Sequence, residues 1–191
     1  MFEVVIFTEE SMNDLVEFQV RRMRKFTDKT IYIVPREDVY VSLVYNPISI
    51  KKEMYPLKSG GALCSITKNS NSKYFYFLYA DSIVLLNPLF LQEMENVAVV
   101  TKPYLDLDIT ILRQERIMRI KHNPILNDYV LTGHYFFTRD FILKYFPDYG
   151  HIEEILKEIV PKCGLKAYRY QGKWLRITSP EELYLLKSIR E

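Results

Sequence analysis

The chain has 191 residues, of which 48% are apolar and 26% are charged, and its formal net charge is +2. These values are typical of one globular domain and exclude a disordered chain. The near-neutral charge gives no indication of a nucleic-acid partner, and no apolar run reaches the ~20 residues of a membrane span. Because no signal peptide is visible, we expect a single cytoplasmic domain over residues 1–191. The 15 tyrosines and only 6 glycines favour a thermophilic source.

Four uninterrupted apolar runs predict strands that are covered on both faces. In chain order these are Val4–Phe7, Thr30–Val34, Tyr74–Ala80 and Val97–Thr101. Between the first two runs, apolar residues recur at helical spacing from Met12 to Met23, and Ser11 stands where a helix cap is expected. A strand, a helix and a strand in this order require a right-handed crossover, so the first two strands should be parallel neighbours.

The middle of the chain contains two turn signals. Lys58-Ser59-Gly60-Gly61 predicts a break, followed by a short helix over Ala62–Lys68, and Val39–Val44 before it is expected to be extended. Gln114-Glu115 separates two runs, Ile109–Arg113 and Arg116–Lys121, in which apolar and polar residues alternate. This alternation predicts a hairpin with one solvent-exposed face.

Short helical and strand-like segments make up the rest of the chain. Helices are expected at Asn87–Glu95, Asp140–Tyr145, Ile152–Val160 and Ser179–Arg190, and a strand at Tyr129–Phe137. Leu165–Tyr170 precedes the last helix. The order of elements predicts an α/β fold, namely a three-layer sandwich with a mainly parallel, Rossmann-like sheet and an antiparallel addition in the second half.

Candidate site residues follow from the rule that open α/β sheets bind ligands beyond the carboxyl ends of their strands. Asp81 directly follows a buried run, where a carboxylate is costly unless it holds a cation or a hydrogen bond, so a metal or ligand role and a structural role both stay open. Ser59, Gly60 and Gly61 precede a helix, and their backbone N–H groups either contact a phosphate or base edge or simply form a turn. The sequence contains no P-loop, no nucleophile elbow and no histidine–cysteine cluster at metal-ligand spacing.

Four segments, taken together, resemble the sugar-nucleotide pyrophosphorylases, the nucleotidyltransferases that couple a nucleoside triphosphate to a sugar 1-phosphate. Leu57–Leu63 is similar to that family's L-G-T-A-G-A-L loop, and Tyr76–Asp81 to its strand ending in N-G-D. Val130–Phe137 resembles the N-A-G-I-Y-x-F strand. Tyr168–Leu183, which contains Gly172-Lys173-Trp174-Leu175-Arg176, resembles the closing G-x-W-x-D-I-G-T-P-E-D-L.

The resemblance implies the nucleotide-diphospho-sugar transferase fold and a nucleotide or nucleotide-sugar ligand. It implies that the base lies against Ser59, Gly60 and Gly61, and that the sugar lies over the strand that contains Gly133. It also implies that Asp81 holds magnesium, with Arg176 at the position of the family's second magnesium aspartate.

The sequence departs from the family at the residues that handle phosphate. Phe7–Ser11 lacks the glycines, arginine and lysine of the phosphate loop, the family's E-K-P is replaced by His122-Asn123-Pro124, and Arg176 replaces the aspartate. Nucleotidyl transfer depends on positioning and on neutralising phosphate charge. Three functions therefore stay open: a divergent nucleotidyltransferase, a glycosyltransferase of the related GT-A-like fold, and a non-catalytic sensor or regulatory subunit. The last would form a homo-oligomer or pair with an active homologue.

The arginine at this position leads to a specific expectation. A guanidinium in place of a carboxylate supplies a fixed positive charge, so Arg176 should pair with Asp81 and replace the magnesium ion. The alternatives are that Arg176 points to solvent from a loop, or that magnesium is bound at Asp81.

Overall fold

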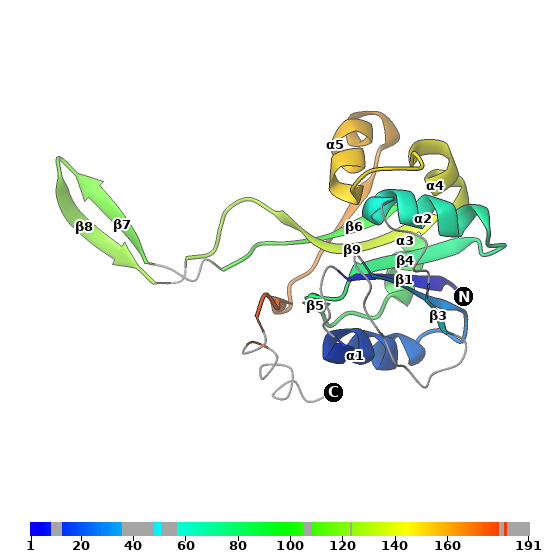
Figure 1. The fold of residues 1–191 in the computed structure, drawn as a ribbon. Helices are drawn as coiled ribbons and strands as arrows, with labels where there is room; N and C mark the ends of the chain where they lie inside the picture. Colours follow the sequence, from blue (N-terminus) through cyan, green and yellow to red (C-terminus); the bar gives the residue numbers. More distant parts are fainter. Residues whose placement is uncertain are drawn as a thin grey trace.

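The computed structural model describes residues 1–8, 13–35, 48–50, 57–104, 108–122, 124–179 and 182. Its centre is a seven-stranded sheet with the strand order β10-β6-β9-β4-β1-β2-β3 (Figure 1). The strands are β1 (Glu3–Thr8), β2 (Ile31–Pro35), β3 (Ile48–Ile50), β4 (Tyr74–Tyr79), β6 (Val97–Thr101), β9 (Val130–Thr138) and β10 (Lys166–Arg169).

The predicted parallel pair is present: β1 and β2 are parallel neighbours, with Val4 opposite Ile31. On the other side of β1 lies β4, also parallel. The antiparallel addition is β9, which is inserted between β4 and β6 and runs against both. Pro35, one residue beyond the predicted run, is the last residue of β2, because the fixed φ of proline is compatible with an extended end.

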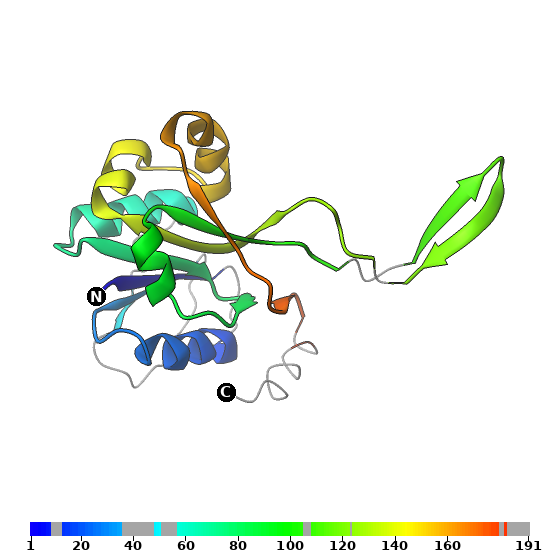
Figure 2. The same cartoon turned by 180° about the vertical axis from the view of Figure 1, so that it is seen from behind.

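Helices cover both faces of the sheet, which gives the three layers expected from the sequence (Figures 1 and 2). One face packs against α1 (Asn13–Arg24) and α3 (Leu89–Met94), and the other against α2 (Lys58–Lys68), α4 (Arg139–Tyr145) and α5 (Ile152–Cys163). All six residues of β1 are buried, as expected for a strand with both faces covered. None of the described helices is long and apolar enough to cross a membrane.

The predicted hairpin consists of β7 (Ile109–Arg113) and β8 (Arg116–Lys121), but the expectation of one buried face is wrong. Figures 1 and 2 show it projecting from the body on two extended segments. Leu112, Ile117 and Met118 are each 60% exposed. Alternation determines which side chains share a face of a hairpin. Whether that face is buried depends on whether the hairpin packs against the rest of the protein.

Several sequence predictions fall outside the described residues, including the extended run at Val39–Val44 and the cap at Ser11. Of the expected closing segment Ser179–Arg190, only Ser179 and Glu182 are described, and they exchange the hydrogen bonds of a capping box. Glu182 Oε2 accepts from the backbone N of Ser179 at 3.2 Å, and the backbone N of Glu182 donates to Ser179 Oγ at 3.4 Å.

The exposed hairpin leads to a prediction about stability. Replacing residues 109–121 with a short glycine–serine linker should leave the free energy of unfolding within about 1 kcal/mol of the parent value, because changes at exposed positions rarely cost more. Urea denaturation of both proteins measures this. A loss of several kcal/mol, or an unfolding midpoint that depends on protein concentration in the parent alone, would show that the hairpin packs against another surface.

Candidate functional site

A cavity of about 280 Å³ lies at the edge of the sheet where β4 ends and β9 begins. Its wall includes a small second sheet, in which β5 (Ser82–Val84) pairs antiparallel with β11 (Trp174–Arg176). The residues important for its chemistry are Asp81, Thr132, Gly133, Glu153, Trp174 and Arg176. The position matches the rule that ligands bind at the carboxyl ends of parallel strands.

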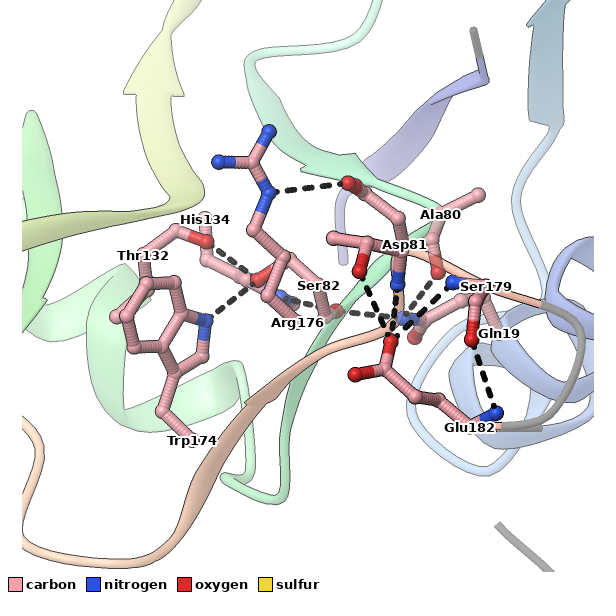
Figure 3. A network of polar contacts seen from close by, with 11 residues as sticks. Gln19, Ala80, Asp81, Ser82, Thr132, His134, Trp174, Arg176, Ser179 and Glu182 are labelled. Carbon is pink, nitrogen blue, oxygen red and sulfur yellow. Dashed lines mark hydrogen bonds and ion pairs between the residues drawn. The ribbon is translucent and has the colours of Figure 1, made fainter. Parts of the chain in front are cut away.

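Asp81 and Arg176 come together because of the β5–β11 pairing. Arg176 lies opposite Ser82 in the register, and the backbone N of Ile177 donates to Asp81 O at 2.8 Å. The predicted ion pair is present: Arg176 Nε donates to Asp81 Oδ2 at 3.3 Å (Figure 3). The contact uses one nitrogen instead of two, and Figure 3 shows the terminal nitrogens of the guanidinium turned away from Asp81.

Beneath this pair, a buried histidine fixes the turn that carries Asp81. His134 Nε2 lies 2.8 Å from Ser82 O, and His134 Nδ1 lies 2.7 Å from the hydroxyl oxygen of Tyr76. A carbonyl only accepts, so Nε2 carries the proton and the Tyr76 hydroxyl donates to Nδ1. Complete burial, assisted by the charge of Arg22, lowers the pKa of His134 to about 3 and keeps the imidazole neutral.

Two further side chains hold the same turn from other directions (Figure 3). Gln19 Nε2 donates to Ser82 O at 2.8 Å and to Ala80 O at 3.4 Å. Trp174 Nε1 donates to Ser82 Oγ at 3.0 Å, and Ser82 Oγ in turn donates to the carbonyl of Thr132. The backbone on both sides of Asp81 is therefore fixed by buried hydrogen bonds, while its carboxylate reaches the cavity.

Glu153 is a site residue that the sequence analysis missed. It lies in the first turn of α5, where an acidic residue is ordinarily explained by the helix dipole. Its Oε2 lies 2.9 Å from the hydroxyl oxygen of Tyr79 and its Oε1 lies 3.0 Å from that of Tyr135, and both phenols donate because a carboxylate only accepts. Burial, together with the charge of Glu153, raises the pKa of Tyr135 well above its usual value.

The glycine pair does not form the turn expected before a helix, because α2 begins at Lys58 and includes both glycines. The backbone N atoms of Gly60 and Gly61 donate to Gly150 O at 2.9 and 3.2 Å. A Cβ on Gly61 would lie 2.6 Å from Asp148 O. The glycines thus allow the backbone of α2 to approach the segment before α5, and their N–H groups are already hydrogen-bonded within the chain.

Ser59 is fully buried beside the glycines. Its Oγ accepts from the backbone N of Ile152 at 3.0 Å and lies 3.0 Å from the hydroxyl oxygen of Tyr79. Because the proton of Tyr79 is given to Glu153, the Ser59 hydroxyl donates to Tyr79. Ser59 therefore acts behind the cavity wall, by orienting Tyr79 and the start of α5.

Gly133, by contrast, lines the cavity together with Asp81 and Arg176. Its φ of +79° suits glycine, and a Cβ here would lie 2.7 Å from Cδ2 of Tyr79. Of the six site residues expected from the sequence, the structure brings these three together and places Ser59, Gly60 and Gly61 in the packing of α2.

The residues around Asp81 do not fit a magnesium site. The guanidinium of Arg176 already places a fixed positive charge 3.3 Å from the carboxylate, and this charge repels a divalent cation. Among the described residues, no three histidine, cysteine or acidic side chains are grouped so that they could hold a metal ion.

At the level of sequence, no protein-family model and no curated protein matches the chain. Solved structures are similar to it over nearly its whole length. HddC from Yersinia pseudotuberculosis has a TM-score of 0.63 at 15% identity and covers 100% of both chains. The inositol-1-phosphate CTP transferase from T. maritima has a TM-score of 0.62 at 15% identity and covers 98% of this chain and 95% of its own. The UTP-bound UGPase from Acinetobacter baumannii has a TM-score of 0.61 at 11% identity and covers 98% of this chain and 92% of its own.

These comparisons confirm the fold that the resemblance implied. The chain has the nucleotide-diphospho-sugar transferase fold of these structures.

The neutral state of His134 predicts a pH dependence of stability. Its pKa is about 6.5 when the chain is unfolded and about 3 in the fold, so the unfolded state takes up the proton first. This contribution to stability is complete above pH 6.5 and is lost progressively as the pH falls toward 3. It amounts to about 2 kcal/mol lost at pH 5.

Urea denaturation between pH 7 and pH 5 measures this loss, and His134→Gln should be less stable at pH 7 but nearly insensitive to pH over the same interval. A His134→Gln variant with an unchanged slope would contradict the neutral imidazole.

A second prediction concerns the ion pair. Because the side chains of Arg176 and Asp81 are 64% and 31% exposed, Arg176→Gln should cost less than about 1 kcal/mol of unfolding free energy at neutral pH. Urea denaturation provides the measurement. A cost of 3 kcal/mol or more, of the order expected for a buried pair, would show that water does not screen the contact.

Proposed function

We propose that the chain binds a nucleotide sugar or a sugar phosphate in the cavity beside Asp81, without magnesium. The observation that carries this proposal is the pairing of Asp81 with Arg176, which puts a guanidinium in place of a metal ion. Arginine suits phosphate because its planar, permanently charged group donates two parallel hydrogen bonds. With only Nε used by Asp81, the terminal nitrogens remain for a ligand.

The chemistry of the cavity wall supports a sugar as the group that it encloses. Sugar hydroxyls are good donors to a carboxylate, and Glu153 is a carboxylate fixed by two phenols. Trp174 offers an aromatic surface for the apolar face of a sugar ring. A volume of about 280 Å³ lies just below the range of whole-ligand pockets, so it suits one sugar unit with the nucleotide extending outside.

A divergent sugar-1-phosphate nucleotidyltransferase is the second candidate function. The similarity of the fold over the whole chain favours it. Transfer also requires cations on a triphosphate, and the phosphate loop that supplies them in the family has no counterpart at Phe7–Ser11. We therefore favour a binding function over nucleotidyl transfer. Incubation with a nucleoside triphosphate and glucose 1-phosphate, followed by assay of pyrophosphate, distinguishes the two.

Trp174 is the only tryptophan of the chain and lines the cavity, so its fluorescence reports directly on occupancy. Titration with glucose 1-phosphate, UDP-glucose and dTDP-glucose should give a saturable change with at least one of them, equally in EDTA and in magnesium. Glu153→Gln should weaken that binding about tenfold, since it replaces a charged acceptor with a neutral one. Glu158→Gln, an exposed change on the same helix, is the matched control. No response to any of the three ligands would contradict the proposal.

The proposal that Arg176 takes the place of a metal ion leads to a further prediction. Arg176→Asp should create a pair of carboxylates and make ligand binding depend on magnesium, because two acidic groups and the ligand phosphate suit that ion. The same titrations, with magnesium varied from zero to millimolar, test this. Magnesium dependence in the parent protein would mean that Arg176 does not replace the ion.

A further inference from the structure

A second cavity, of about 670 Å³, adjoins the first and shares Trp174 and Arg176 with it. It lies between the end of β6 and the segment that connects β10 to β11. Besides the shared pair, its wall includes Lys102, Tyr104, Gln171 and Lys173. The volume falls within the range of ligand-binding pockets.

The two cavities differ in charge. Asp81 and Glu153 line the first cavity together with Arg176. Among the described residues that line the second cavity, the groups charged at neutral pH are Lys102, Lys173 and Arg176, and none is acidic. The whole chain has nearly equal numbers of basic and acidic residues, 26 and 24. Among the described residues, Lys102 and Lys173 therefore add two cations to Arg176, which Asp81 contacts from the first cavity, and cations grouped in a concave site attract anions.

Hydrogen bonds tie the two walls of the second cavity together. At the end of β6, Thr101 Oγ1 donates to Tyr170 O at 3.1 Å, and the backbone N of Tyr170 donates to Val100 O at 2.8 Å. Lys102, which lines the cavity, also has its Nζ 5.3 Å from the centre of the Tyr129 ring, a cation–π contact. Lys102 and the segment that carries Lys173 are thus held on either side of one space.

We propose that this second cavity receives an anionic group, a carboxylate or a phosphate, on the sugar whose ring occupies the first cavity. This inference rests on the proposed function and names the substrate class: sugar phosphates with a second negative charge, such as uronic acid 1-phosphates or hexose bisphosphates. Trp174 separates the two cavities and contacts the sugar. Arg176 lines both, and Lys102 and Lys173 recognise the second anion.

Three commercially available ligands test the proposal by Trp174 fluorescence in low salt: glucose 1-phosphate, glucuronic acid 1-phosphate and glucose 1,6-bisphosphate. The two acidic ligands distinguish a carboxylate from a phosphate as the preferred group. We expect at least one to bind about tenfold more tightly than glucose 1-phosphate, since two exposed ion pairs supply a factor of that order. The preference should decrease as salt is added.

The double variant Lys102→Gln/Lys173→Gln should abolish this preference and leave the affinity for glucose 1-phosphate unchanged. Lys162→Gln, which removes one charge from an exposed position in α5, is the control and should retain the preference. Equal affinity of the parent for all three ligands overturns the inference but leaves the proposed function intact. So does a double variant that weakens all three alike, because the anomeric phosphate would then occupy the second cavity. Failure of all three ligands to bind overturns the inference, and it overturns the proposed function as well if UDP-glucose and dTDP-glucose also fail to bind.

Discussion

The buried hydrogen bond from His134 to Ser82 is the interaction on which the site depends. It requires a neutral imidazole, and complete burial between two strands and α1 keeps it neutral. Through Ser82, the same bond fixes β5, the turn at Asp81 and the pairing of β5 with β11. Without that pairing, the segment that carries Trp174 and Arg176 would have no defined position relative to the sheet. A polar group deep in the core therefore positions a charged pair at the surface.

The pairing of Asp81 with Arg176 explains how the chain holds a carboxylate at the end of a buried strand. A carboxylate at the end of a buried strand must be compensated, and a guanidinium does this without an ion. An arginine bound through Nε still has donors for a phosphate. An arginine at this position thus compensates the carboxylate and keeps donors for the anion of the proposed function, without disturbing the layers around it.

The fold could be predicted from the sequence wherever a run of apolar residues showed that both faces of a strand must be buried. Uninterrupted apolar runs require cover on both faces, and β1, β4 and β6 are indeed central strands of the sheet. The glycine pair was misplaced because glycine serves both turns and close contacts between backbones, and only the approach of Asp148 and Gly150 to α2 distinguishes these uses. The exposed hairpin was misjudged for a related reason, since alternation says nothing about the path of the chain beyond the hairpin.

The sequence by itself determined β1, β2, β4 and β6, the helices that cover the sheet and the contact between Asp81 and Arg176, because these follow from local patterns and from a resemblance with one recognisable substitution. Only the tertiary structure decided that Glu153 belongs to the site, that Ser59 lies behind it, and that a second, cationic cavity adjoins the first. Each of these depends on side chains tens of residues apart in sequence that lie within hydrogen-bond distance or line one space. Distances of that kind are set by how helices pack on the sheet, and no local pattern encodes them.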